Sequence, residues 1–244
     1  THALAHNVTR LSRLDLPGAG QIYVAGDYAY IGHITNKESL GTSIVDVSDP
    51  RAPRVVSRVP VGDNNSHSHK ARVIGDIMIV NVEQNAALGR KADELPKLRV
   101  QLRSELGRDP THNELAEKLG VSAADIAAVE AMEKQPYDQG GFKIYDVSER
   151  TKPKLITHHK THGRGVHRFD MDANYAYIST EMPGYIGNIL VIYDIRNPSK
   201  PEEVSRWWLP GQHLAGGEKP LVLRGFTNSI ALSYMFIRVL ISRN

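Results

Sequence analysis

The stretch from Leu190 to Pro201, LVIYDIRNPSKP, decides the fold because its order of residue types occurs twice more in the chain. It returns at 44–53 and at 144–153, and in every copy an Asp precedes the last Pro by seven residues. A run of β-branched and aromatic residues that ends in Asp and Pro is typical of a strand entering a tight turn. The chain is therefore predicted to repeat one β unit.

Each copy extends to a unit of four short strands. A turn dipeptide and a strand come before the signature, at 26–31, 75–80 and 173–178, and an outer strand follows it at 56–59 and at 204–207. Successive units are 48 or 49 residues apart, which is close to the period of four-stranded propeller blades. Because one such unit cannot bury both faces, we predict a mainly β fold: a partial β-propeller of four-stranded antiparallel blades, with three recognisable repeats and a three-helix insertion.

The LVIYD signature resembles the LVIVD-repeat family of bacterial and archaeal proteins, which implies a β-propeller. The resemblance covers about residues 7–85 and 137–218 and implies little about function. Residues 8–16 match an outermost strand, and we expect them to complete a blade whose other strands lie elsewhere. Closed propellers have about 4–8 blades, so three units indicate either an altered or truncated propeller or an oligomer that covers the open edge.

About fifty residues interrupt the second unit. The distance from turn to signature Asp is 20 residues in the first unit and 71 in the second. Within the extra segment, leucines at helical spacing precede Gly107, and capping-box patterns at 111–114 and 122–125 open two further helices. The predicted organisation is propeller repeats at 7–85 and 137–218, a helical insertion at 86–136, and an atypical tail at 219–244.

Residues 94–134 also resemble the helix-turn-helix-like region of bacterial sigma factors. DNA binding would require basic or amide side chains on the third helix, whereas 123–133 is acidic and rich in alanine. We therefore expect no nucleic-acid partner, and we interpret the insertion as a helical cap or as a contact element for another protein.

Composition restricts the class of protein only weakly. A net charge of +3, from 30 basic and 27 acidic residues, does not indicate a nucleic-acid or membrane partner. The chain has no cysteine, so disulfides and thiolate chemistry are excluded. No signal peptide is visible, and the apolar run at 230–241 is too short to cross a bilayer. A cytoplasmic location is the default expectation, with a secreted or periplasmic location left open.

The histidines carry the chemical signal. Six residues before the turn positions of the second and third units stand His69 and His167, and eight residues after those positions stand Glu83 and Glu181. Strands joined by a tight turn bring such positions to one end of the sheet, and the first strand of each propeller blade lines the central channel. Imidazole and carboxylate groups are metal ligands. We therefore predict a site for a divalent transition metal, or a catalytic site, at the channel mouth.

Other residues are weaker candidates for the same mouth. Lys70 and Arg168 adjoin the two predicted ligands and could bind an anionic group of a small-molecule substrate, or they are rim charges. His158 and His159, in an outer strand, are expected to be exposed. The additional candidate ligands are His33, His67, His162 and His213.

A histidine before an inner strand is often only a turn residue bonded to the backbone. Two functions of different class therefore stay open: a propeller with a metal-binding or catalytic site, and a non-catalytic interaction scaffold that uses the helical insertion. Whether the protein is an enzyme is undecided from the sequence.

Overall fold

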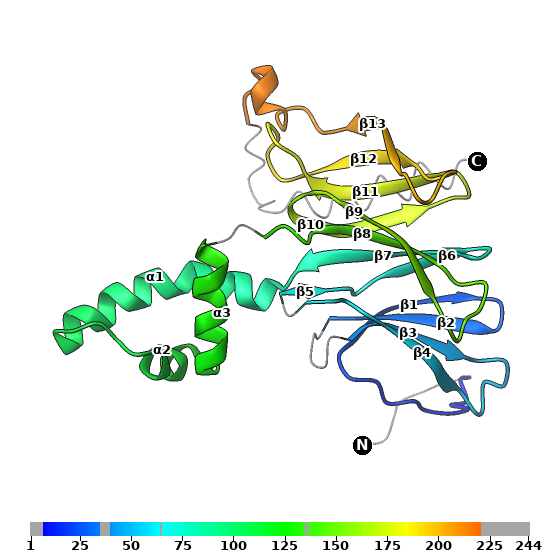
Figure 1. Ribbon diagram of the computed structural model, residues 1–244, viewed down its shortest axis with the longest axis horizontal. Helices are drawn as coiled ribbons and strands as arrows, with labels where there is room; N and C mark the ends of the chain where they lie inside the picture. The colour runs from blue at the N-terminus through cyan, green and yellow to red at the C-terminus, as the bar shows by residue number, and fades with distance from the viewer. Residues whose placement is uncertain (1–6, 35–39, 64, 135–136, 221–244) are drawn as a thin grey trace.

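The computed structural model describes residues 7–34, 40–63, 65–134 and 137–220. Its strands form three four-stranded antiparallel blades, which we call blades 1, 2 and 3 and which lie side by side in chain order (Figure 1). Blade 1 is a separate sheet, whereas the residue pair Gly165↔Glu83 joins blades 2 and 3 into one sheet. The prediction of a mainly β partial propeller is confirmed. Blade 1 comprises β1 (Ala19–Ala25), β2 (Tyr28–His33), β3 (Leu40–Asp46) and β4 (Arg54–Pro60). Blade 2 comprises β6 (Ala71–Ile74), β7 (Ile77–Gln84), β8 (Gly141–Asp146) and β9 (Lys154–Lys160). Blade 3 comprises β10 (His162–Met171), β11 (Tyr175–Glu181), β12 (Asn188–Asp194) and β13 (Glu202–Trp207).

The repeated signature forms the end of the third strand of each blade and the turn after it. The carboxylates of Asp46, Asp146 and Asp194 each accept a backbone N–H two residues further on, at 3.0, 2.8 and 2.9 Å. An Asx turn of this kind explains why Asp ends the strand in every copy. The hairpin turns before the second strands use Gly26 and Gly75 in the left-handed region, with φ of 55° and 57°, a conformation that favours glycine.

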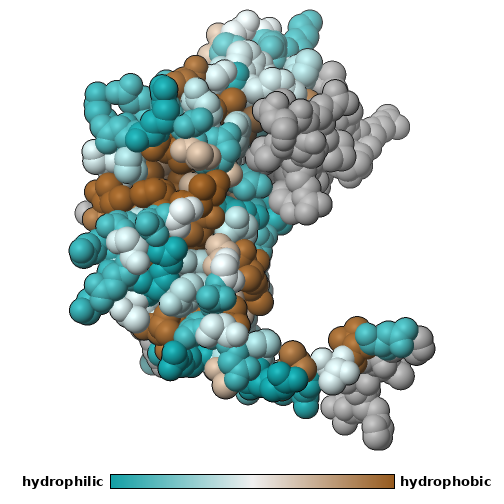
Figure 2. Space-filling model, turned by 90° about the vertical axis from the view of Figure 1, so that its right-hand side faces the viewer, coloured by the Kyte–Doolittle hydropathy of each residue, from teal (hydrophilic) through white to brown (hydrophobic). Residues whose placement is uncertain are grey.

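Apolar side chains fill the spaces between neighbouring blades. Successive residues of a strand point to opposite faces, so that in β7 Met78 packs in the cluster shared with blade 1 and Ile79 in the cluster shared with blade 3. Tyr30 contributes to the first cluster, and Phe142 and Phe169 contribute to the second. Figure 2 shows hydrophobic surface in bands flanked by hydrophilic residues on the face turned to the viewer. The blades are therefore held together face to face.

The segment at 8–16 is not a strand, which contradicts the sequence prediction. Among the described residues, none at 8–16 pairs with a strand. Ser12 Oγ nevertheless donates to Pro50 O at 2.7 Å, as Ser57 Oγ of β4 donates to Arg150 O of blade 2 at 2.8 Å. Since Ser12 and Ser57 are equivalent in the repeat, the segment contacts blade 1 as β4 contacts blade 2.

The insertion forms the three predicted helices: α1 (Ala86–Leu106), α2 (His112–Leu119) and α3 (Ala123–Lys134). Both predicted capping boxes are present, with Thr111 accepting from the N–H of Glu114 and Ser122 accepting from the N–H of Asp125. Leu102, Leu115 and other apolar side chains form a separate core between the helices, which stand away from the sheets in Figure 1.

After β13, the described chain continues through a 3₁₀ turn at Leu214–Gly216 to residue 220. Residues 221–244 of the atypical tail lie outside the described residues, and the division of the chain into domains stays a prediction. Within the part of the chain that the structure describes, no helix combines the length and apolarity needed to cross a membrane.

Candidate metal centre

The candidate centre lies at the end of blade 2 that is opposite the Gly75 turn. Glu83 is the penultimate residue of β7, and His67 lies in β5 (Ser66–His67), a two-residue strand that pairs with β7. His167 comes from β10 of blade 3. The chain leaves this end of β7 directly into α1, so the helical insertion begins beside the site (Figure 1).

Irregular pairing of the inner strands sets the direction of the histidine side chains. Opposite β7, the pairs Ala71↔Val80 and His67↔Glu83 leave one extra residue on the inner strand. In blade 3, Val166 pairs with Thr180 and Arg168 with Ser179, so His167 is the extra residue of a bulge. Bulges bend a strand and redirect a side chain, and they are common beside active sites. The structure therefore repeats one irregularity at His69 and His167, the two positions that the repeat alignment made equivalent.

Blade 1 has the same irregularity between Ala19 and Ile22 but contributes no ligand there. The equivalent residue is Gly20, where a Cβ atom would lie 3.0 Å from His69 O. The backbone of blade 2 therefore occupies the space that a side chain from blade 1 would need.

The carboxylate of Glu83 lies close to three imidazoles. Glu83 Oε2 lies 3.3 Å from His67 Nε2 and 3.6 Å from His69 Nδ1, and Glu83 Oε1 lies 2.7 Å from His167 Nδ1. The rings of His69 and His167 have centroids 5.5 Å apart, and those of His67 and His69 are 5.1 Å apart. His67, His69 and Glu83 form a group whose ligand atoms all lie within 4.8 Å of one another.

The electrostatics of the cluster suit metal ligands. Burial lowers the pKa of His69 to about 3, although the Glu83 carboxylate acts in the opposite direction. Burial by itself would raise the pKa of Glu83, but hydrogen bonds from His167 and His67, together with charge on His167 and His69, outweigh it and lower this pKa to about 2. At neutral pH the cluster therefore offers a neutral imidazole and an ionised carboxylate, the forms that bind metal ions.

A polar chain behind His67 connects the site to the end of the insertion. Ser66 Oγ donates to Asp63 Oδ2 at 2.6 Å and so accepts the proton of the Tyr137 hydroxyl at 2.7 Å. Burial raises the pKa of Tyr137, with Asp63 and Glu83 acting in the same direction. Sequence reasoning missed Tyr137, because only the return of the chain from the insertion brings it back to β5.

The predicted pairing of His167 with Glu181 is absent. Glu181 Oε2 instead accepts the backbone N–H of Arg164 at 3.0 Å. At the start of β10, Gly163 leaves room for this carboxylate, since a Cβ there would lie 1.5 Å from Glu181 Oε2. Glu83 from the neighbouring blade takes the place that the alignment gave to Glu181.

The additional histidine candidates divide into one that joins the cluster and three that lie elsewhere. His67 joins it. His33 is fully buried, with Nδ1 2.8 Å from Pro17 O and Nε2 2.8 Å from Ser43 Oγ. His162 pairs in register with Glu181 at the exposed start of β10, and His213 stacks on Tyr185 with ring centroids 4.4 Å apart. His2 and His6 lie outside the described residues.

The neighbouring cations and the outer-strand histidines differ in burial from what the sequence suggested. Lys70 is buried, 1% exposed, with Nζ 5.9 Å from the centre of the Phe169 ring, and burial together with Arg72 and Arg168 lowers its pKa to about 7.

The expectation that His158 and His159 are exposed is wrong. Both are half-buried: His158 Nε2 lies 3.0 Å from Gln139 O, and His159 stacks on Phe142.

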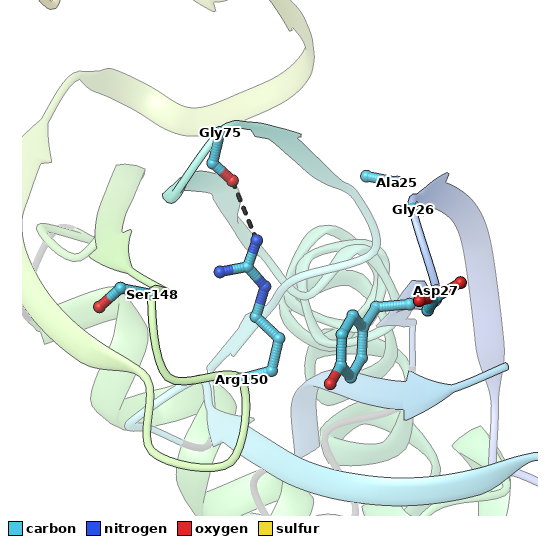
Figure 3. A pocket seen from close by; sticks show the side chains of 7 residues that line it. Ala25, Gly26, Asp27, Gly75, Ser148 and Arg150 are labelled. Carbon is cyan, nitrogen blue, oxygen red and sulfur yellow. Dashed lines mark hydrogen bonds between the residues drawn. The ribbon is translucent and has the colours of Figure 1, made fainter. Parts of the chain in front are cut away.

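A cavity of about 440 Å³ lies at the other end of the strands, between the turns of blades 1 and 2 (Figure 3). The Arg150 side chain crosses it and donates to Gly75 O at 3.1 Å and to Asp76 Oδ1 at 2.7 Å. These bonds join two turns of blade 2, so Arg150 has a structural role at this end.

Comparison with known proteins identifies the repeat and leaves the function open. The LVIVD repeat family matches residues 18–61, which form blade 1, and residues 171–207, which form most of blade 3. No curated protein matches the chain. A similar solved structure is an S. cerevisiae complex described as a Dbp5 variant bound to Nup159, a Gle1 variant, IP6 and ADP; it shares 9% identity and a TM-score of 0.36, over 81% of this chain and 32% of that one. Over the residues that the structure describes, the chain thus forms three β blades and carries LVIVD repeats in blades 1 and 3.

Proposed function

We propose that His67, His69 and Glu83 bind a divalent transition metal ion at the mouth of the propeller. The spacing of the ligand atoms is the observation that carries this proposal. In a tetrahedral site with bonds of about 2.0–2.1 Å, ligand atoms are roughly 3.3–3.4 Å apart. Glu83 Oε2 lies 3.3 and 3.6 Å from the two imidazole nitrogens, so the side chains need little movement to bind an ion.

His167 holds the other oxygen of the carboxylate in this proposal. Its Nδ1–H donates to Glu83 Oε1 at 2.7 Å, as outer partners of metal ligands commonly do. Since His167 belongs to blade 3 and the three ligands belong to blade 2, the inter-blade packing sets the direction of the carboxylate.

The second nitrogen of His67 is not part of the proposed ligand set. Nδ1 of His67 is buried, and none of the residues that the structure describes forms a hydrogen bond with it. An ion bound through Nε2, the nitrogen near Glu83, would leave the proton of this imidazole on Nδ1, where a buried water molecule would have to accept it.

Three protein ligands leave a coordination position for water or a substrate, as in catalytic zinc sites. A metal ion so placed would polarise a bound oxygen or lower the pKa of a bound water molecule. The side chains of the three proposed ligands are 8–14% exposed and that of His167 is 26% exposed, so a small molecule would have to enter past His167. We therefore infer a metal-dependent reaction on a small-molecule substrate as the function of this mouth.

The proposal is tested by loading the metal-free protein with Zn²⁺, Mn²⁺, Fe²⁺ or Co²⁺ and measuring bound metal by elemental analysis and affinity by calorimetry. We expect one ion per chain. His69→Ala and Glu83→Gln should abolish stoichiometric binding, whereas His167→Ala should weaken it by about 10–100-fold, the usual effect of losing an outer partner.

His112→Ala is the matched control, because His112 is an exposed imidazole that also pairs with a carboxylate, Glu130, at 3.1 Å. Its binding should equal that of the unmodified protein. Absence of a bound ion with all four metals, or equal binding by the Glu83→Gln variant, contradicts the proposal.

A second candidate function is an interaction scaffold, favoured by apolar residues on the insertion. Val100 and Leu106 of α1 are 71% and 42% exposed, although the helices already have a core of their own. We propose that these two exposed apolar side chains contact a protein partner. Replacing both residues by Lys should leave metal binding unchanged, which separates the two functions experimentally.

A further inference from the structure

Asn81 of β7 lies at the point where β7, β10 and the irregular inner strand of blade 2 meet, and it is fully buried. Its Oδ1 accepts the backbone N–H of Lys70 at 2.9 Å. Its Nδ2 lies 2.9 Å from Val166 O and 3.1 Å from His69 Nδ1. One side chain therefore contacts the bulge, the neighbouring blade and a proposed metal ligand.

The backbone decides which way the amide points. The N–H of Lys70 can only donate and the carbonyl of Val166 can only accept, so the oxygen of Asn81 faces Lys70 and the NH₂ group faces Val166. The second hydrogen of that NH₂ group is then directed at His69 Nδ1. This nitrogen must accept, and a neutral imidazole with an accepting Nδ1 carries its proton on Nε2.

We propose that Asn81 is a positioning residue that fixes the tautomer of His69 with the proton on Nε2. In this tautomer His69 would bind a metal ion through Nδ1 and not through Nε2. Glu83 Oε2 lies 3.6 Å from the same Nδ1. Ligation through Nε2 would require a proton on Nδ1, which would face the N–H of Asn81. An ion at Nδ1 would take the lone pair that now accepts the second N–H of Asn81, so it would have to displace this hydrogen bond, whereas the bonds to Lys70 and Val166 do not depend on that lone pair. The metal part of this inference rests on the proposed function; the tautomer part does not.

The arrangement is specific to blade 2. Six residues after the turn, where blade 2 has Asn81, blade 1 has Gly32 and blade 3 has Ser179. A Cβ at Gly32 would lie 2.2 Å from the carbonyl carbon of His69, so no side chain fits there. Serine has a single O–H donor, so it cannot donate to two groups as the NH₂ of an amide does. The neutral, oriented imidazole thus belongs to the one blade that supplies all three proposed ligands.

The tautomer is measured in metal-free protein labelled with ¹⁵N-histidine, using long-range ¹H–¹⁵N correlations. We expect the proton of His69 on Nε2, and a proton on Nδ1 would overturn the inference. His167 is the internal control, because donation to Glu83 places its proton on Nδ1 in every variant that leaves Glu83 intact.

Two variants test whether Asn81 is the cause. Asn81→Asp keeps an oxygen for Lys70 but turns an acceptor toward His69, so the His69 proton should move to Nδ1. Asn81→Leu removes the donor and should give a mixture of both tautomers. An unchanged Nε2–H signal in the Asp variant contradicts the role of Asn81, even if the Leu variant does not fold.

The ligating nitrogen is then read from the Co²⁺-loaded protein. The ring Cδ2–H adjoins Nε2 and is remote from Nδ1, so ligation through Nδ1 should spare this proton of His69 from the strongest paramagnetic broadening. Full broadening of Cδ2–H means ligation through Nε2 and overturns the inference. If Co²⁺ does not bind, the proposed metal function fails, while the tautomers of the metal-free variants still decide the role of Asn81.

Discussion

At the scale of single residues, one imidazole can support the fold or serve a site, depending on what its two nitrogens contact. His33 is completely buried, and both nitrogens are used within blade 1: Nδ1 must donate to Pro17 O, which leaves Nε2 to accept the proton of Ser43. His69 Nδ1 accepts from Asn81 and also lies 3.6 Å from Glu83 Oε2. The first arrangement belongs to the core and the second to a candidate site.

We predict that His33→Leu destabilises the protein by about 2–4 kcal/mol, because it leaves the buried groups of Ser43 and Pro17 without partners. Urea unfolding followed by circular dichroism measures the change. His112→Ala, which removes an exposed imidazole, is the control and should change stability by less than about 1 kcal/mol. The affinity of the folded His33→Leu protein for metal should be unchanged, and a parallel loss of affinity would place His33 in the metal site after all.

At the scale of elements, the hairpin β10–β11 depends on a carboxylate in its turn. Asp172 Oδ1 accepts the N–H groups of Asn174 and Tyr175 at 2.7 and 2.8 Å, and Oδ2 accepts the Tyr177 hydroxyl at 2.7 Å. Burial acts to raise the pKa of Asp172, but these hydrogen bonds bring it below its ordinary value of 3.8. Burial and the bond to Asp172 raise the pKa of Tyr177 to about 12.

These shifts predict a window of pH in which the pair stabilises the hairpin. A depressed carboxyl pKa contributes stability that is complete above the ordinary value of 3.8 and is lost as the pH falls below it. A raised phenol pKa contributes stability that is complete below the ordinary value of 10.0 and is lost as the pH rises toward 12. Tyr177→Phe should therefore cost about 1 kcal/mol near neutral pH and progressively less outside this window.

Urea unfolding of both proteins across the pH range measures this difference. Tyr175→Phe, in the same strand, is the matched control for the loss of a phenol hydroxyl. A Tyr177→Phe cost that stays constant through acid and alkali would show that the hydroxyl contributes by packing alone.

At the scale of the whole molecule, two cores are separated along the chain. Leu115 and Leu102 belong to the core of the helical insertion, whereas Phe142 packs between blades 2 and 3 against His159 and Tyr193. Since each core excludes water by itself, the insertion and the sheets should lose structure separately.

We predict that Leu115→Ala lowers the protection of amide hydrogens in α1, α2 and α3 by about 2–4 kcal/mol, the usual cost of removing a buried leucine side chain. Amides of β7 and β10 should be unaffected. Phe142→Ala should have the opposite pattern, and Val100→Ala, an exposed site on α1, should change neither. Hydrogen exchange followed by mass spectrometry measures the protection in all three variants. If Leu115→Ala lowered protection in both the insertion and the sheets, the two would form one cooperative unit.

Local interactions were predictable at all three scales. The strands, the Asx turns after Asp46, Asp146 and Asp194, and the two capping boxes of the insertion depend on residues within a few positions of one another, so a pattern of residue types specifies them. The repeat alignment also placed His69 and His167 at equivalent positions, because one β unit is used more than once.

Tertiary structure decided how those local pieces make a site. The alignment paired each His with the Glu of its own hairpin, but Glu83 faces imidazoles from two blades, while Glu181 turns to the backbone of Arg164. That choice depends on bulges and on the contact between blades, which join residues 84 positions apart and leave no trace in local sequence. The sequence by itself determined the repeating β units and the helices, since neighbouring residues form them; only packing between blades decided which carboxylate and which imidazoles meet.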